Sequence, residues 1–289
     1  CGKILADLGA DVIKIEPPWG DSARGIGPFY QDDPHPEKSL FWACYASNKR
    51  SITLNLETKE GQKILRELVK SAHFLVESYR PGYLSDLGLG WPEIRDLNPH
   101  LIMVSITPFG QDGPYRDYQA TDLIGMALSG MMYLTGDPDR PPVRVSTPQF
   151  WAIGSASGAA GSMVANHHRL LTGKGQHVDA SCQQAVARAL SHAPMIWDLE
   201  GLNMQRQGPY RPVGSVNLRV NWMCQDGYIN FIQPGGVTGA RSIMNLSKWM
   251  DEEDAGHSVL RSTKWEEIGF GLFDKELLDE MTPPLERFF

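Results

Sequence analysis

The sequence predicts an α/β fold built on a parallel sheet, because helical and strand-like patterns alternate along its first two thirds. Residues 3–9 carry apolar side chains at helical spacing and end at a glycine, and residues 11–16 then alternate as a strand does. A second strand over residues 51–56 is followed by an amphipathic helix over residues 59–71 and a third strand over residues 73–77. Repeated helix-to-strand steps of this kind are typical of a parallel sheet.

The next segments extend the same pattern. A turn at residues 80–82 precedes a short helix over residues 91–98 and a buried strand over residues 101–106. A glycine- and proline-rich loop then covers residues 108–115. Loops at the carboxyl ends of parallel strands are where ligands usually bind, so we expect this loop to be part of a site.

Two further helices are predicted over residues 121–133 and 149–171. The second is rich in Gly, Ala and Ser, which favours close packing of the helix against its neighbours. A glycine turn and a strand that contains Asp179 follow, and residues 182–198 then carry another helical pattern.

The chain divides into a large and a small domain by composition. Residues 1–200 form the predicted large α/β domain, with a Rossmann-like parallel sheet, and the polar, Gly/Pro/Arg-rich residues 201–220 resemble a linker. Residues 221–289 begin a smaller α+β domain with a hairpin whose turn is predicted at Asp226-Gly227. Both ends stop inside apolar patterns without capping residues, so we expect a strand before residue 1 and further small-domain residues after 289.

Composition excludes several classes of function. The chain has 289 residues, a net charge of -7 and no apolar run near the roughly 20 residues that a membrane helix needs. The acidic balance argues against broad binding to nucleic acid, and we expect small molecules or proteins as partners. The four cysteines, Cys1, Cys44, Cys182 and Cys224, lack the spacing of a zinc or redox site, which favours a reducing cytoplasm.

Common catalytic motifs are missing from the sequence. It contains no Walker loop, GxGxxG, HExxH or GxSxG. The pair His167-His168 is not expected to bind a metal, because adjacent helical residues point about 100° apart. The sequence therefore predicts no metal site.

Six segments in a fixed order carry a family resemblance. They cover residues 5–18, 48–52, 75–82, 98–102, 109–115 and 172–176. Together they resemble the family III CoA-transferases, also called the CaiB/BaiF family, which include formyl-CoA transferase, carnitine CoA-transferase and the α-methylacyl-CoA racemases. The stretch 149–151 is similar to the branch of the benzylsuccinate CoA-transferase subunits.

The resemblance implies a large and a small domain, with two chains threaded through each other as an interlocked dimer. Coenzyme A is a substrate in that family, and no tightly bound cofactor is implied. Basic side chains are expected on its phosphates and Tyr79 on its adenine. The residues expected to bind it are Lys49, Arg50, Leu54, Ser78, Tyr79, Arg80, Gly110, Gln111 and Arg116.

Family chemistry requires a carboxylate nucleophile, an Asp that attacks the thioester of the acyl-CoA. The resemblance places that position at Trp151, and an indole ring cannot perform this reaction. Two further departures are Pro17 and Asp86, which stand where relatives often have Arg. The resemblance therefore assigns no catalytic residue in this chain.

Two other carboxylates are candidates for a substitute. Asp122 lies where the racemases of the family place a His-Asp pair, but Thr121 fills the histidine position, which disfavours racemisation. Asp179 follows a glycine turn within a strand, where a structural role is favoured. Both Asp122 and Asp179 are catalytic candidates.

Three hypotheses remain open. The first is a CoA-transferase subunit that acts on acyl-CoA thioesters and small carboxylic acids, as a homodimer or as a heteromer whose related partner brings the Asp. The second is a catalytically silent homolog that binds acyl-CoA or serves as a scaffold. The third is an acyl-CoA racemase or isomerase with a different base.

Overall fold

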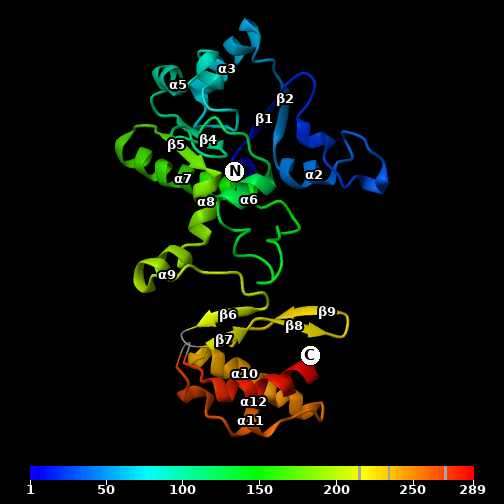
Figure 1. The fold of residues 1–289 in the computed structure, drawn as a ribbon. Coiled ribbons are helices and arrows are strands. Elements are labelled where there is room, and N and C mark those ends of the chain that lie inside the picture. Colours follow the sequence, from blue (N-terminus) through cyan, green and yellow to red (C-terminus); the bar gives the residue numbers. More distant parts are fainter. Residues whose placement is uncertain (214–215, 234, 270–271) are drawn as a thin grey trace. The chain divides into compact units, whose positions relative to one another are not determined.

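The chain folds into two compact units, each with its own core (Figure 1). The computed structural model describes residues 1–213, 216–233, 235–269 and 272–289. Unit 1 comprises Cys1–Met132 and Arg144–Leu202, and unit 2 comprises Tyr133–Val143 and Asn203–Phe289. The segment Tyr133–Val143 thus belongs to unit 2, although it lies within the range predicted for the large domain.

The strands of unit 1 are parallel, as predicted. β1 (Ile13–Glu16) pairs with β2 (Arg50–Thr53), and a second sheet has the order β3 (Phe74–Glu77), β4 (Ile102–Thr107), β5 (His177–Ser181). All six residues of β4 are buried, as expected for the central strand of a parallel sheet that is covered on both faces. The α/β fold class is confirmed.

The helices of unit 1 connect these strands. They are α1 (Gly2–Asp7), η1 (Ser22–Gly25), η2 (Tyr30–Asp32), α2 (Leu40–Ala46), α3 (Lys59–Ser71), α4 (Tyr83–Asp86), α5 (Trp91–Leu97), α6 (Asp122–Leu128), α7 (Phe150–Thr172), α8 (Cys182–Ala189) and α9 (His192–Glu200).

Two predicted helices differ from the structure. The helix predicted over residues 121–133 ends at Leu128, and Gly130 then adopts a left-handed conformation (φ 84°) that turns the chain. The helix predicted over residues 182–198 is divided into α8 and α9. Pro194 lies in the first turn of α9, where its missing N–H is tolerated, whereas inside a continuous helix it would remove a hydrogen bond.

Two apolar layers enclose the three-stranded sheet. On one face, side chains of α3 and α5 such as Leu65, Val69 and Ile94 pack with Met103. On the other face, α6, α7 and α8 pack against the side chains that alternate with these along β4, which are Ile102, Val104 and Ile106. In Figure 1, α3 and α5 accordingly lie on one side of β4 and β5, with α7 on the other.

Helix α7 approaches the sheet closely because its buried face is made of small residues. A Cβ atom at Gly154 would lie 2.2 Å from Sγ of Cys182, and one at Gly158 would lie 3.1 Å from Ile106. Larger side chains would push α7 away from α8 at Gly154 and away from the sheet at Gly158.

Unit 2 combines antiparallel hairpins with helices. β6 (Tyr210–Val213) pairs with β7 (Val216–Arg219), and β8 (Asn221–Cys224) pairs with β9 (Gly227–Asn230). The helices are α10 (Gly236–Glu252), α11 (Ser258–Ser262), η3 (Trp265–Glu267) and α12 (Lys275–Phe288). Their core includes Leu218, Trp222, Ile243, Met250 and Leu285.

Two details of unit 2 differ from prediction. The stretch 201–220, expected to be a linker, contains β6 and β7, because Val216 and Leu218 alternate with polar residues and bury one face of the strand. The second hairpin pairs Cys224 with Gly227, so its turn consists of Gln225 and Asp226. The predicted turn at Asp226-Gly227 is therefore wrong by one residue.

Among the described residues, no helix has both the length and the apolar character that crossing a membrane requires.

Candidate functional site

The carboxyl ends of the three strands of the larger sheet meet at one edge. The register pairs Glu77 with Ser105 and Ser105 with Asp179 across the sheet. The loops that follow β3 and β4, residues 78–80 and 108–111, therefore start side by side. Both loops carry residues predicted to bind coenzyme A, and this edge is where α/β sheets usually bind ligands.

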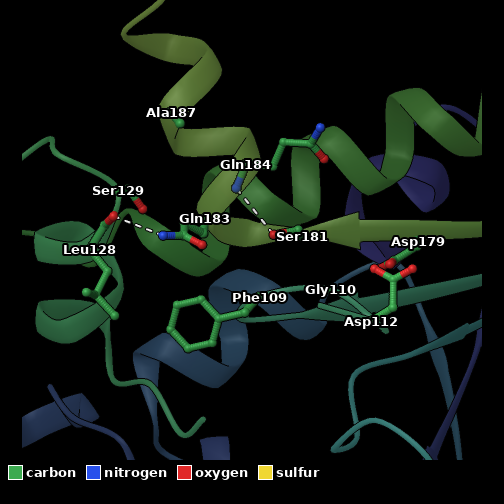
Figure 2. Close-up of a pocket in the computed structure, with 10 residues that line it drawn as sticks. All are labelled: Phe109, Gly110, Asp112, Leu128, Ser129, Asp179, Ser181, Gln183, Gln184 and Ala187. Carbon is green, nitrogen blue, oxygen red and sulfur yellow. Dashed lines mark hydrogen bonds between the residues drawn. The ribbon is translucent and has the colours of Figure 1, made fainter. Parts of the chain in front are cut away.

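An open pocket of about 440 Å³ lies at this edge (Figure 2). It lies between the loop after β4, the end of α6 and the first turns of α8. Its lining residues are Phe109, Gly110, Asp112, Leu128, Ser129, Asp179, Ser181, Gln183, Gln184 and Ala187. The lining is mixed, with two carboxylates, hydroxyls and amides beside the ring of Phe109.

The loop after β4 is held by hydrogen bonds from its backbone. The N–H of Gly110 donates to Oγ1 of Thr107 (3.0 Å), and the N–H of Gln111 donates to Oδ2 of Asp179 (2.8 Å). Gly110 has φ 96°, and a Cβ atom there would lie 3.3 Å from the same carboxylate oxygen. Glycine thus permits both the turn and the close approach of the loop to Asp179.

Helix α8 closes the opposite wall of the pocket. The hydroxyl of Ser181 accepts a hydrogen bond from the N–H of Gln184 (3.3 Å) and caps the helix. The side-chain amide of Gln183 donates to the carbonyl oxygen of Leu128 (3.0 Å), which ties α8 to the end of α6. Figure 2 shows both bonds as dashed lines.

Glu77, Ser105 and Asp179 form a polar row across the sheet beside the pocket, and this grouping was not predicted from the sequence. Oε2 of Glu77 accepts the N–H of Tyr79 (2.7 Å), and Oγ of Ser105 lies 2.9 Å from Nε2 of His177. The imidazole ring of His177 stacks on the indole ring of Trp91, with ring centroids 5.8 Å apart. Polar residues that alternate within otherwise apolar strands were the available signal.

Burial determines the charge balance of this row. Burial raises the pKa of Glu77, and the charge of Asp179 acts in the same direction, whereas the hydroxyl of Ser105 and the N–H of Tyr79 oppose it. Burial lowers the pKa of His177, and Asp179 opposes this effect. The row therefore favours the neutral form of His177 more than water does.

The predicted arginines are held by weak, exposed ion pairs. Arg50 pairs with Asp11 (2.6 Å) and Arg80 with Asp86 (2.8 Å), and all four side chains are at least 60% exposed. Exposed pairs of this kind contribute little to stability, so a phosphate group can compete for the arginines. Each carboxylate also reduces the positive charge that a phosphate would meet.

Arg116 and Lys49 lie in more crowded surroundings. A terminal nitrogen of Arg116 comes within 3.8 Å of the Cβ position at Gly82, which places the guanidinium beside the turn that follows β3. Lys49 is half-buried and its ammonium group contacts the carbonyl oxygen of Tyr45. Burial, followed by the charges of neighbouring lysines, lowers the pKa of Lys49.

The remaining predicted contacts differ in exposure. Leu54 is buried in the core beside α3, so its side chain is not available to a ligand. Ser78 and Tyr79 are exposed, and the ring of Tyr79 lies 4.6 Å from that of Tyr83. The hydroxyl of Tyr83 donates to Glu57 (2.5 Å), and this bond raises the pKa of Tyr83 to about 12. Of the two rings, that of Tyr79 is the more exposed, at 41%.

Trp151 lies in the first turn of α7 and is half-buried. Its ring meets that of Phe150 edge-on, with centroids 5.5 Å apart, and it packs on the core beneath α7. It does not line the pocket of Figure 2.

Asp122 is engaged as the cap of α7. Its Oδ1 accepts the N–H groups of Gln149 (2.7 Å) and Phe150 (2.8 Å), and its Oδ2 lies 3.8 Å from Arg144. The side chain is 14% exposed. Both N–H groups belong to the unsatisfied start of the helix, so a structural role accounts for this carboxylate.

Within the described parts of the chain, no three His, Cys, Asp or Glu side chains gather in a way that could hold a metal ion.

Comparison with known proteins bears on this site. Residues 1–277 match the family described as CoA-transferase family III. The chain is 40% identical over 253 residues to the succinyl-CoA:(R)-benzylsuccinate CoA-transferase subunit BbsE of Thauera aromatica, covering 87% of this chain and 60% of that protein. It is also 40% identical over 191 residues to the succinyl-CoA–L-malate CoA-transferase beta subunit of Chloroflexus aurantiacus, covering 65% of this chain and 46% of that protein.

The fold has a matching solved structure. A CAIB/BAIF family protein from Brucella suis superposes with a TM-score of 0.74 and 28% sequence identity, over 98% of this chain and 71% of that one. The chain thus spans only part of the length of these relatives, about half to three fifths for the two curated enzymes.

Proposed function

The chain belongs to CoA-transferase family III, and from this premise we propose that it takes part in the transfer of coenzyme A between an acyl-CoA thioester and a carboxylic acid. We propose further that it acts in a heteromer with a related chain that supplies the nucleophilic Asp. The names of BbsE and of the malate CoA-transferase beta subunit, both subunits of larger enzymes, support this choice over a homodimer. The proposal includes the cytoplasmic location predicted from the cysteine pattern.

The observation that carries the proposal is the side chain at Trp151. In the family reaction a carboxylate oxygen attacks the thioester carbonyl, the coenzyme A thiolate leaves, and a mixed anhydride forms. The thiolate then attacks the enzyme's own carbonyl, releases the first acid and leaves an aspartyl-CoA thioester for the second acid. An indole ring has no oxygen with which to begin this sequence.

The nearest candidate for a substitute is already engaged. Asp122 accepts two backbone N–H groups at the start of α7, and a nucleophile there would have to abandon its helix cap. Together with Thr121 in the histidine position, this arrangement disfavours the racemase hypothesis as well. The nucleophile is therefore expected on the partner chain.

The chain's own contribution in this proposal is to receive acyl-CoA. The loops after β3 and β4 offer Tyr79 for the adenine ring and the arginines Arg80 and Arg116 for phosphates. Lys49 and Arg50, at the start of β2, add two further basic side chains for the phosphates. Binding energy from these distant contacts would position the thioester for attack by the partner.

A catalytically silent homolog that binds acyl-CoA is the second candidate, and it is favoured by the same residue. If no partner exists, Trp151 leaves the chain able to bind but unable to transfer. The two candidates differ only in what a second chain adds.

Assays of transfer and binding, with and without a related chain, distinguish the heteromer subunit from the silent homolog. The chain would be produced alone and together with a related chain that carries Asp at the position corresponding to Trp151, with succinyl-CoA as donor and a panel of free carboxylic acids as acceptors. Transfer by the mixture and not by either chain alone supports the heteromer. Binding of acyl-CoA without transfer in any combination supports the silent homolog, and loss of both contradicts the proposed function.

A further inference from the structure

Two carboxylates at the ends of neighbouring strands each hold the backbone of a loop. Glu77, the last residue of β3, accepts the N–H of Tyr79 at 2.7 Å. Asp179 on β5 accepts the N–H of Gln111 at 2.8 Å, across 68 positions of sequence. These are the two loops in which coenzyme A contacts are expected, and each is held at its first turn.

The two carboxylates belong to one row of the sheet. Glu77 is paired with Ser105, and Ser105 with Asp179, so their side chains lie on the same face. Ser105 is 1% exposed and lies 2.9 Å from Nε2 of His177. Ser105, in the middle of the row, thus contacts His177, and the indole ring of Trp91 stacks on His177.

One oxygen of each carboxylate is engaged by a loop backbone. Oε2 of Glu77 and Oδ2 of Asp179 are directed at backbone N–H groups, and a Cβ atom at Gly110 would lie 3.3 Å from Oδ2 of Asp179. Each acid thereby holds the first residues of one loop through a backbone hydrogen bond.

We propose that Glu77 and Asp179 are positioning residues, which hold the Tyr79 and Gln111 loops in the shape that receives acyl-CoA. The inference rests on the proposed function, because that function assigns the two loops to coenzyme A. The proposal assigns the same positioning role to Asp179 and to Glu77.

The positions of the two carboxylates at the sheet edge explain how they would aid binding. A loop that samples several shapes must lose that freedom when it binds a ligand, and fixing it beforehand removes part of this cost. The chain does so with acceptors on two outer strands, while β4 between them holds the row in register. Removing one acceptor should loosen one loop and leave the other in place.

Amide hydrogen exchange of the full chain tests the anchors without any ligand. Asp179→Ala should raise the exchange rate in peptides that cover Gln111 by about tenfold, the value of one lost hydrogen bond. Asp179→Asn keeps an acceptor oxygen and should restore most of the protection. Glu77→Ala and Glu77→Gln should behave in the same way for peptides that cover Tyr79.

Asp96→Ala is the matched control, because it removes the same charge from a side chain that is 74% exposed and pairs with Arg95 at 3.4 Å. It should leave both loops unchanged. Unaltered exchange at Gln111 in the Asp179→Ala variant would overturn the inference. So would an equal increase over the whole chain, which would mean that the variant is merely unfolded.

Affinity for succinyl-CoA, measured by calorimetry, gives the second readout. Asp179→Ala and Glu77→Ala should each weaken binding, by about tenfold, and the Asn and Gln variants should recover most of it. If the unaltered chain does not bind the thioester at all, the proposed function fails while the exchange data still decide the anchors. If it binds and no anchor variant weakens binding, the anchors have no positioning role.

Discussion

Glu16 lies at the end of β1, 4% exposed, and accepts hydrogen bonds from three directions. Arg24 donates to both of its oxygens (2.7 and 2.9 Å), Ser51 donates at 2.6 Å, and the N–H of Asp21 donates at 3.2 Å. The guanidinium of Arg24 also lies over the ring of Trp42, 4.1 Å from its centroid. One carboxylate thus ties the segment after β1 to β2 and α2.

Replacing Glu16 should reveal this role as a pH-dependent loss of stability. The Arg24 guanidinium, with Ser51 and Asp21 in the same direction, lowers the pKa of Glu16 to about 2 from its ordinary 4.5. The stability this confers is complete above pH 4.5 and is lost as the pH falls toward 2. Glu16→Gln should lower the free energy of unfolding at pH 7 by about 3 kcal/mol, measured by urea denaturation.

The difference between the two proteins should shrink as the pH falls below 4.5. Glu37→Gln is the matched control, since Glu37 also pairs with Arg24 (2.8 Å) but is 72% exposed, and its loss should be at most about 1 kcal/mol. A Glu16→Gln variant with the stability of the control would contradict this account.

Asp122 offers a second test at a single position. Because its carboxylate caps α7, Asp122→Ala should lower the free energy of unfolding by about 1 to 2 kcal/mol, whereas Asp122→Asn keeps an acceptor and should lose less. Asp117→Ala, at a side chain that is 80% exposed, should be close to neutral. Thermal unfolding followed by circular dichroism distinguishes the three, and equal stability of all variants would rule out the cap.

At the scale of elements, α7 depends on the small residues of its buried face. An Ala at Gly154 would place Cβ 2.2 Å from Sγ of Cys182 and 3.1 Å from its Cα atom, so the helix and α8 would have to separate. Alanine is favoured in helices by roughly 1 kcal/mol over glycine, but overpacking costs about 1 to 3 kcal/mol and should prevail.

Gly154→Ala should therefore destabilise the chain by about 1 to 2 kcal/mol in urea denaturation. Val164→Ala, on the same helix at a residue that is 73% exposed, should be close to neutral. A stabilised Gly154→Ala variant would show that helix propensity outweighs packing here.

The element pattern was largely predictable because local signals decide it. The strands of unit 1 and most of its longer helices were expected near their places, since apolar periodicity and glycine turns are local, whereas the short helices α2 and α4 were not predicted. The break between α8 and α9 was missed although Pro194 marks it, because the apolar pattern continues through Leu190 and Ile196. The turn of the second hairpin was misplaced because register depends on which pairs face each other across both strands.

The site was less predictable, because it depends on contacts between distant segments. The resemblance drew attention to Tyr79, Gly110 and Gln111, which lie near the sheet edge. Neither Glu77 nor His177 was singled out. Only the strand register brings Glu77 into one row with Ser105 and Asp179, and His177, whose register partner is Met103, meets that row through its contact with Ser105. Leu54 was expected at the ligand but is buried, because its side chain faces the core under α3.

At the scale of the whole molecule, we propose that the nucleophile of the transfer reaction lies on a partner chain. Trp151 occupies the position that the resemblance assigns to the nucleophile, and Asp122 is engaged at the start of the same helix. Any nucleophile contributed by a partner lies outside this sequence, so no reading of the chain alone could have identified it.

The most direct test is the intact mass of the purified chain after incubation with succinyl-CoA and hydroxylamine, which converts an enzyme-bound anhydride or thioester into a stable hydroxamate. Our account predicts an unchanged mass for the chain alone, and a modified Asp on the related chain when both are present. A hydroxamate formed on an acidic residue of this chain in the absence of any partner would contradict it.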